Sequence, residues 1–264
     1  MLVDHPLISR RVFFPRPSNL EPTCRVEVGD AHLACYAFRR HPQAVMILHF
    51  HGNGELAAEY AADSAEFFLC LSINVCFAKY RGYGASTGTP GLGTMLGDGE
   101  QIVRALSVPA ERLVVFGRSL GSVYAIELAR RLPQIAGLIL ESGIADLLEN
   151  WPVAESDMER CGFTRGELPR EVATHFDHRA KLQHYLGPQL VLHSEHDQFL
   201  DRSHAERLNA WGGGSGKRLV IFPNGNHNTI LFANFMEYVR EVPQLLRRAG
   251  VVPVPGVPKP APST

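Results

Sequence analysis

The stretch VVFGRSLGS, residues 114–122, places a serine between two glycines where an apolar run meets a segment of helical period. Its centre, GRSLG, fits the pattern G-x-S-x-G, which requires a strand before the serine and a helix after it. A serine in so tight a turn takes a strained backbone conformation, and Gly117 and Gly121 are small enough to let strand and helix approach. The pattern predicts Ser119 as a nucleophile at the carboxyl end of a sheet. A serine that only caps a helix is the alternative.

Apolar runs alternate with longer segments of helical period along the chain, which is typical of a mostly parallel sheet with helices on both faces. Near the start, Gly29 and Asp30 separate two such runs and predict an antiparallel hairpin. The sequence therefore predicts an α/β fold with a central sheet of about eight strands. The expected strands are residues 23–28, 32–38, 44–50, 73–78, 112–117, 136–141, 189–194 and 217–222, and the expected helices are residues 55–70, 94–107, 120–131, 201–211 and 229–248.

Two segments interrupt this alternation. Residues 143–187 are too long for a plain connection between strands and carry helical pieces of their own, so we expect a short lid insertion above the sheet. Residues 251–264 are rich in proline with little to bury, and they are predicted to be a disordered tail. We therefore expect one domain, residues 1–250. Four apolar lid residues are candidate pocket walls, although packing onto the core is the favoured role: Leu148, Trp151, Phe163 and Phe176.

Composition narrows the classes of partner. The 264 residues carry a formal net charge of −1, with Lys and Arg scattered, so we expect no nucleic-acid partner. No run approaches the roughly 18 apolar residues of a membrane helix, and no secretion signal is expected. We therefore expect a soluble, cytoplasmic protein; the sequence does not indicate its oligomeric state. The odd number of cysteines, without a C-x-x-C pair, favours buried free thiols in a reducing compartment: Cys24, Cys35, Cys70, Cys76 and Cys161.

Two further motifs follow strands expected later in the chain, namely HSEHDQFLD at residues 193–201 and NGNHN at residues 224–228. A serine hydroxyl is a weak nucleophile until an imidazole removes its proton, and the imidazole needs a carboxylate to hold its tautomer. Ser119, Asp197 and His227 each lie just past the carboxyl end of a different strand, where an open α/β sheet gathers its functional groups. The order serine, acid, histidine therefore predicts a catalytic triad.

The acid has rivals in the sequence. Glu195 and Asp201 flank Asp197, and Glu141 ends another expected strand, a position from which some folds of this type supply the acid. We favour Asp197. As alternatives, Asp197 caps the following helix and His227 is an ordinary loop histidine, but the matching order of the three residues favours the triad.

The motif HFHGNGE begins at His49, directly after an expected strand. Glycines after a strand let the backbone turn sharply and offer free N–H groups, so Asn53 is the predicted oxyanion donor beside Leu120, with Gly54 as a fallback. An ordinary turn between strand and helix is the alternative. His49 and His51 have no acidic ligand nearby, so no metal is expected. No Walker or dinucleotide motif is complete, so no cofactor is expected.

Taken together, HGNG, YRGYGASTGTP (residues 80–90), GRSLGS, HSEHD and GNH resemble the α/β-hydrolase family. The resemblance covers residues 10–248, and it is to serine hydrolases that include depalmitoylating enzymes and many uncharacterised bacterial hydrolases. It implies the α/β-hydrolase fold, with Tyr80, Arg81 and Gly82 shaping the floor of the active site, for which a plain glycine-rich loop is an equal alternative. The short polar lid, and HSEHD where a glycine is common, depart from the family pattern and leave the substrate open.

The features above predict a serine hydrolase that cleaves carboxylic esters or thioesters through an acyl-enzyme on Ser119, with a small-molecule acyl substrate. An aminopeptidase-like or amidase hydrolase is the nearer alternative. It would need an acidic patch in the lid to hold a free amine, for which Glu149, Glu155, Asp157 and Glu159 are candidates unless they form a solvated face. A non-catalytic binding protein with the same fold is the alternative of another class.

Overall fold

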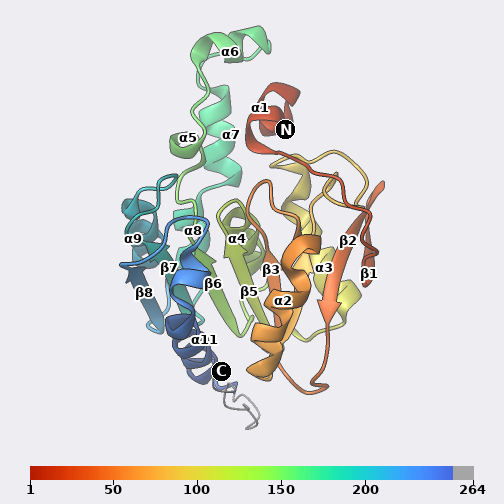
Figure 1. The fold of residues 1–264 in the computed structure, drawn as a ribbon. Coiled ribbons are helices and arrows are strands. Elements are labelled where there is room, and N and C mark those ends of the chain that lie inside the picture. The colour runs from red at the N-terminus through yellow and green to blue at the C-terminus, as the bar shows by residue number, and fades with distance from the viewer. Residues whose placement is uncertain (252–264) are drawn as a thin grey trace.

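The computed structural model describes residues 1–251, apart from the side chains of residues 60, 62 and 63. The predicted tail lies outside the described residues except for Val251. The described strands form one eight-stranded sheet in the order β1-β2-β4-β3-β5-β6-β7-β8 (Figure 1). The pairs β1–β2 and β2–β4 are antiparallel and the others are parallel, which confirms the predicted fold class. The strands are β1 (Cys24–Val28), β2 (Ala31–Phe38), β3 (Met46–Phe50), β4 (Asn74–Ala78), β5 (Leu113–Arg118), β6 (Gly137–Glu141), β7 (Gln189–Ser194) and β8 (Lys217–Phe222).

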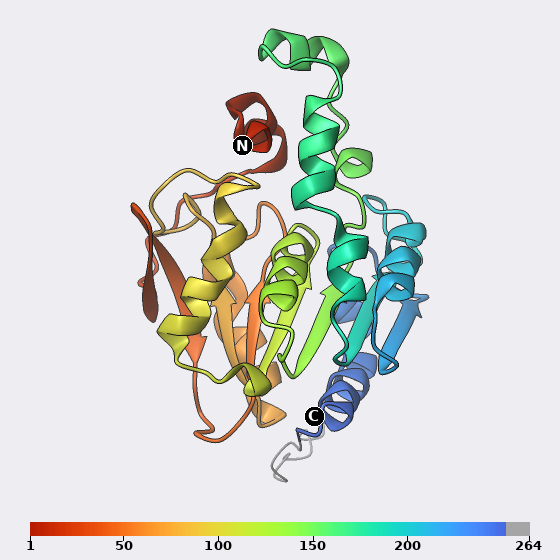
Figure 2. The ribbon, with the colours of Figure 1, turned by 180° about the vertical axis from the view of Figure 1, so that it is seen from behind.

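Helices cover both faces of the sheet, because its inner strands are apolar on both sides. In β5, Val114 and Phe116 belong to one core cluster, while Leu113 and Val115 belong to the other. Figure 1 shows α2 and α11 in front of the sheet, and Figure 2 shows α3, α4, α8 and α9 behind it. These helices are α2 (Ala57–Cys70), α3 (Asp98–Leu106), α4 (Gly121–Arg131), α8 (His178–Gln183), α9 (Arg202–Trp211) and α11 (Phe235–Arg248).

Two predicted helices have a different form in the structure. The helix expected at residues 94–107 starts with a 3-10 turn, η2 (Thr94–Gly97), and continues as α3. The helix expected at residues 229–248 is divided into α10 (Ile230–Ala233) and α11. Asn234 causes this division, because its side-chain amide donates to the Ile230 carbonyl (2.8 Å) and the Asn224 carbonyl (3.0 Å) while its own backbone leaves the helical region.

The N-terminal residues fold into elements that the sequence did not predict. They form the 3-10 turn η1 (Leu2–Asp4) and the helix α1 (Pro6–Val12). With three and seven residues, both are too short to show a periodicity in the sequence. Proline at its first position and the His5 ring, which accepts from the Leu7 N–H, start α1. Its buried side chains, Ile8 and Val12, join the main core. The N-terminus therefore belongs to the folded body beside the carboxyl edge of the sheet (Figure 1).

The segment 143–187 stands above that same edge, beside α1 (Figure 1). Glu171 fastens it to the N-terminus by accepting from the N–H groups of Leu2 (3.0 Å) and Val3 (2.9 Å). Of the four candidate pocket walls, Phe176 is buried, and Leu148, Trp151 and Phe163 are partly buried against the core, as packing residues would be. The elements before α8 are α5 (Leu147–Asn150), α6 (Glu155–Arg160) and α7 (Glu167–His175).

The cysteines are free thiols, as predicted, but they are not all buried. Cys35 and Cys76 are buried, whereas Cys70 is exposed because it closes α2 on its solvent side. Cys24 and Cys161 are intermediate. Among the helices of residues 1–251, none combines the length and the apolar character that crossing a membrane would require.

Candidate active site

The turn between β5 and α4 has the predicted geometry. Ser119 adopts a left-handed backbone conformation with φ of 51°, which is strained for a residue with a side chain. A Cβ atom on Gly117 would lie 2.6 Å from the Ala125 Cβ, and one on Gly121 would lie 2.1 Å from the Phe50 carbonyl oxygen. Both distances are far below van der Waals contact. The structure therefore confirms the strained serine and the need for glycine on either side of it.

The structure brings Ser119, Asp197 and His227 together, although 108 and 30 residues separate the paired side chains in the chain. His227 Nδ1 lies 2.7 Å from Asp197 Oδ2, and His227 Nε2 lies 3.1 Å from Ser119 Oγ. The side chains of His227 and Asp197 are 7% and 1% exposed. These contacts fit a neutral imidazole that donates its Nδ1–H to the carboxylate and accepts the serine hydroxyl proton at Nε2. The arrangement can take a proton from Ser119.

Both carboxylate oxygens of Asp197 are hydrogen-bonded. Its Oδ2 faces His227, and its Oδ1 accepts from the N–H groups of Phe199 and Leu200, each at 3.0 Å. Burial would raise the pKa of this carboxyl, but the bond from His227 and the two backbone donors outweigh it and lower the pKa to about 2. Asp197 is therefore ionised at neutral pH, as a partner of an imidazolium must be.

The rival carboxylates do not reach the histidine. Glu195 pairs with an arginine at 3.1 Å, and Asp201 caps α9 by accepting from a backbone N–H at 2.9 Å. Glu141 is buried and is bound by an arginine and a tyrosine. Of the four carboxylates that the sequence offered, only Asp197 has a hydrogen bond to His227 within the described residues.

The loop after β3 carries the predicted oxyanion donors. The Asn53 side chain accepts from the Tyr83 hydroxyl (2.9 Å) and the Phe14 N–H (3.2 Å), which fixes the loop against the N-terminal segment. Leu120 lies at the N-terminal end of α4, where backbone N–H groups lack helical partners. Across residues 1–251, neither the Asn53 N–H nor the Leu120 N–H has an acceptor in the protein. Both are therefore available to an oxyanion, and the fallback Gly54 forms the positive-φ turn beside them.

The aromatic-glycine segment after β4, residues 80–90, contacts two different parts of the molecule. The Tyr80 hydroxyl donates to the His51 carbonyl at 2.6 Å, so Tyr80 supports the oxyanion loop. Arg81 points elsewhere, because its guanidinium makes two bonds of 2.9 Å to Asp98 at the start of α3. Gly82 forms a positive-φ turn. Within this segment, Tyr80 thus contacts the loop after β3 and Arg81 supports α3, while a role in shaping the active-site floor stays a prediction.

Comparisons with known proteins agree with this fold. The family Hydrolase_4, described as serine aminopeptidase S33, matches residues 40–161. Protein bem46 of Schizosaccharomyces pombe is 27% identical over 187 residues, which are 69% of this chain and 61% of that protein. Human alpha/beta hydrolase domain-containing protein 17C is 26% identical over 221 residues, which are 80% of this chain and 62% of that protein. The Pyrococcus furiosus esterase Pf2001 superposes with a TM-score of 0.69 at 15% identity, over 89% of this chain and 98% of the esterase.

The chain belongs to the α/β-hydrolase superfamily. Mouse alpha/beta hydrolase domain-containing protein 10 has the same fold, with a TM-score of 0.64 and 15% identity over 85% of this chain and 98% of that one. This chain covers about three fifths of the length of bem46 and of protein 17C. The structural neighbours, at such low identity, establish the fold of the hydrolase and leave its substrate open.

Sequence reasoning missed Arg118 in this α/β-hydrolase. It occupies the variable position directly before the serine in G-x-S-x-G, where the pattern gives no signal, and its guanidinium contacts three segments around the site. Tyr238, which donates to Glu141 at 2.7 Å, was missed as well, because α11 lies far along the chain. Within the described part of the chain, no three His, Cys, Asp or Glu side chains converge as a metal site would require.

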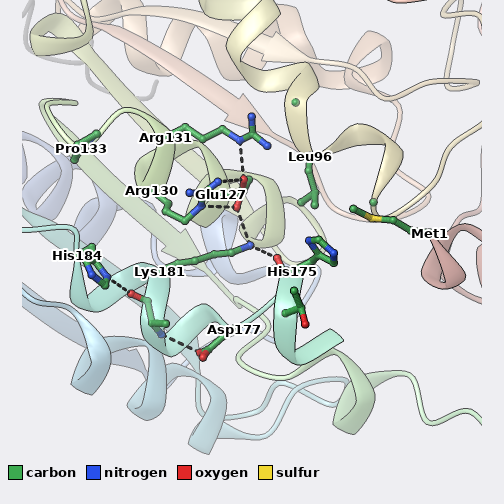
Figure 3. A pocket seen from close by; sticks show the side chains of 14 residues that line it. Met1, Leu96, Glu127, Arg130, Arg131, Pro133, His175, Asp177, Lys181 and His184 are labelled. Atoms are coloured by element: carbon green, nitrogen blue, oxygen red, sulfur yellow. Dashed lines mark hydrogen bonds and ion pairs between the residues drawn. The ribbon is translucent and has the colours of Figure 1, made fainter. Parts of the chain in front are cut away.

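A hollow of about 970 Å³ lies behind the sheet of this α/β-hydrolase, between α4, α8 and the N-terminus. Figure 3 shows Glu127 there, bonded to Arg130 (2.7 Å), Arg131 (2.6 Å) and Lys181 (2.7 Å). We call these four residues the helix cluster. None of the triad residues lines this hollow, and the cluster links α8 to α4. Its charges are satisfied within the protein, so its contacts are those of a structural cluster.

Proposed function

We propose that this α/β-hydrolase is a serine hydrolase that cleaves carboxylic ester or thioester bonds through an acyl-enzyme on Ser119. The observation that carries the proposal is the continuous set of hydrogen bonds from Asp197 through His227 to Ser119, at 2.7 and 3.1 Å. The strained turn that presents Ser119, and the unpaired N–H groups beside it, support the same reaction.

In the acylation step, His227 Nε2 takes the hydroxyl proton as Ser119 Oγ attacks the substrate carbonyl carbon. The carbonyl oxygen becomes an oxyanion that accepts from the N–H groups of Asn53 and Leu120. Each donor contributes roughly 3 kcal/mol to lowering the barrier. When the intermediate collapses, its bond to the alcohol or thiol breaks, and the imidazolium of His227 gives its proton to the leaving group.

In the deacylation step, a water molecule replaces the leaving group. His227 takes a proton from the water, its oxygen attacks the ester carbonyl on Ser119, and the same two N–H groups hold the second oxyanion. Collapse releases the carboxylic acid and returns the proton to Ser119. Asp197 stays ionised throughout, because its pKa lies near 2, and it stabilises the imidazolium of His227.

An aminopeptidase is the second candidate, favoured by the description of the family that matches residues 40–161. Such an enzyme needs a carboxylate that is free to bind the substrate ammonium group. Three of the four carboxylates considered for this role already pair with arginines: Glu149, Glu155 and Asp157. Their pairing favours the esterase or thioesterase over the aminopeptidase.

Covalent labelling tests the proposed nucleophile. The wild-type protein should gain one fluorophosphonate adduct by intact-mass spectrometry, located at Ser119 by peptide mapping. Ser119→Ala should gain none, and His227→Ala should label at least a hundredfold more slowly. Ser64→Ala, a matched change on α2 away from the triad, should label at the wild-type rate. A folded Ser119→Ala protein that still takes one equivalent of probe would overturn the proposal.

Turnover tests the bond that is cleaved. The wild-type protein should hydrolyse 4-nitrophenyl esters or acyl thioesters of graded chain length faster than aminoacyl 4-nitroanilides. Turnover of the anilides alone would replace the esterase with the aminopeptidase. A folded wild-type protein that neither labels nor hydrolyses any member of the panel would favour the binding protein.

A further inference from the structure

Arg118 is the last residue of β5 and directly precedes Ser119, yet only 14% of its side chain is exposed. Its guanidinium has three different partners. Nε lies 3.0 Å from a Glu141 carboxylate oxygen, Nη1 pairs with Glu55, and Nη2 donates to the backbone carbonyl oxygen of His227 at 2.6 Å. A single side chain therefore connects three segments that meet at the site.

Each of these partners belongs to a segment with a part in the proposed reaction. Glu55 follows the oxyanion donor Asn53 by two residues in the loop after β3. Glu141 ends β6, and its backbone carbonyl accepts from the Ser119 N–H at 2.9 Å. His227 is the base itself. Arg118 thus reaches the oxyanion loop, the strand beside the nucleophile and the histidine loop together.

A buried tyrosine completes the hydrogen bonds around Arg118. The second oxygen of Glu141 accepts from the Tyr238 hydroxyl at 2.7 Å, and the side chains of Glu141 and Tyr238 are 4% and 1% exposed. We call Arg118, Glu55, Glu141 and Tyr238 the rim cluster. Its geometry fits the planar fork of a guanidinium, which donates from three separate nitrogens, whereas the three N–H groups of lysine all lie on one nitrogen and cannot reach partners spaced in this way.

We propose that Arg118 is a positioning residue, which holds the backbone of His227 so that its Nε2 stays within hydrogen-bond distance of Ser119 Oγ. This inference rests on the proposed function. The ring of His227 is held by Asp197 and Ser119, and the bond from Arg118 fixes the backbone behind the ring. Because a shift of about 1 Å in a reacting group can cost roughly a hundredfold in rate, loss of this bond affects the chemical step.

A matched pair of lysine substitutions tests the inference. Arg118→Lys should lower kcat on the preferred ester by at least tenfold, with KM within about twofold of wild type, because a residue that only positions the base has no part in substrate binding. Arg218→Lys is the control. Arg218 also binds a buried glutamate, Glu241, with one bond of 2.9 Å, but it lies on β8 outside the rim cluster. Its kcat should remain within twofold of wild type.

Chemical rescue separates positioning from general damage. A cavity of about 310 Å³ lined by Arg118, Glu55 and Phe77 adjoins the rim cluster, so a small cation can reach the space that Arg118→Ala leaves. Millimolar guanidinium chloride should restore several-fold of the kcat lost in Arg118→Ala, and urea, which is uncharged, should not. Neither compound should restore His227→Ala, whose missing group is the base.

The outcomes distinguish this inference from the proposed function. A folded Arg118→Lys protein with wild-type kcat would overturn the inference and leave Ser119 as the nucleophile. Should the Arg118 variants fail to fold, Glu55→Gln decides, with an expected loss of at least threefold in kcat; an unchanged kcat overturns the inference. The downfield Nδ1–H proton resonance of His227 gives a reading that needs no turnover. It should broaden in Arg118→Lys or Glu55→Gln and persist in Arg218→Lys, whereas an unaltered resonance in the first two overturns the inference even if the proposed function has failed.

Discussion

Asp197 and Glu127 are two carboxylates of this α/β-hydrolase that share one property and differ in their surroundings. Burial would raise the pKa of each, yet hydrogen bonds outweigh it and lower the pKa of both to about 2. Asp197 has one imidazole and two backbone N–H groups as partners. Glu127 has three cationic side chains, from α4 itself and from α8.

The two carboxylates differ in whether a partner group can change its charge during a reaction. The imidazole beside Asp197 has a second nitrogen that reaches Ser119, so its charge can vary during a reaction. The three cations around Glu127 are Arg130, Arg131 and Lys181, and none of them has a hydrogen bond to a triad residue within the described residues. A lowered pKa therefore marks both a reactive arrangement and a structural one, and the neighbours decide between them.

The largest effect should come from Asp197→Asn. The amide cannot accept the Nδ1–H of His227 and bond its own backbone partners as the carboxylate does, and it favours the wrong imidazole tautomer. We expect kcat to fall roughly 10³-fold to 10⁴-fold. The free energy of unfolding should change far less, since the asparagine oxygen still accepts from Phe199 and Leu200. Ester turnover and urea unfolding measure the two quantities. A loss of stability in proportion to the loss of rate would instead make Asp197 a structural carboxylate.

The opposite result is expected for Glu127→Gln. This change leaves three cations around a neutral amide, so the free energy of unfolding should fall by roughly 3 kcal/mol. The rate of fluorophosphonate labelling per folded molecule should match wild type. The stability that Glu127 provides is complete above pH 4.5 and is lost as the pH falls toward 2, so the difference from wild type should narrow in acid. A large loss of labelling in this variant would erase the distinction between the two carboxylates.

Much of the fold, and the placing of the candidate site, followed from patterns within single segments. The apolar runs predicted the strands, because a parallel sheet covered on both faces requires them. The glycines beside Ser119 were predictable for a related reason, since the contacts that exclude a Cβ are made within one strand-turn-helix unit and its neighbour β3. Strand ends converge on one edge, which allowed Asp197 and His227 to be placed beside the serine.

The remainder depends on contacts between distant segments. Arg118 shows the limit, because its contacts with Glu55, Glu141 and the His227 carbonyl depend on three segments that no local pattern relates. The N-terminal helix α1 is too short for a period to be recognised, although it supports the Asn53 loop. Glu141 looked like a rival acid at the end of its strand, and only its buried bonds to Arg118 and Tyr238 show another use.

Two buried histidines extend the comparison to acid conditions at smaller effect. His178 lies one turn before Lys181, and His49 lies near Arg118. Burial is the larger cause, and the neighbouring cation the next, of a pKa lowered to about 4 for His178 and to about 3 for His49. Each histidine therefore stays neutral in the folded protein while it becomes protonated in the unfolded chain below its ordinary pKa of 6.5. Stability is complete above pH 6.5 and is lost as the pH falls toward 4 or 3.

As the pH falls from 6.5 to 5, each histidine should lower the free energy of unfolding of the wild-type protein by about 2 kcal/mol. His178→Asn and His49→Phe should each flatten the wild-type dependence by that share, as measured by urea unfolding at intervals of pH. The rate should distinguish the two regions again. The His49 ring lies 4.6 Å from the Phe116 ring, and Phe116 is two residues before Arg118 of the rim cluster. His49→Phe should therefore alter kcat. His178 lies in α8, and its Nδ1 is hydrogen-bonded to the Ile144 carbonyl, away from the rim cluster. His178→Asn should therefore leave kcat unchanged; a loss of kcat there would show that the two faces of the sheet are coupled.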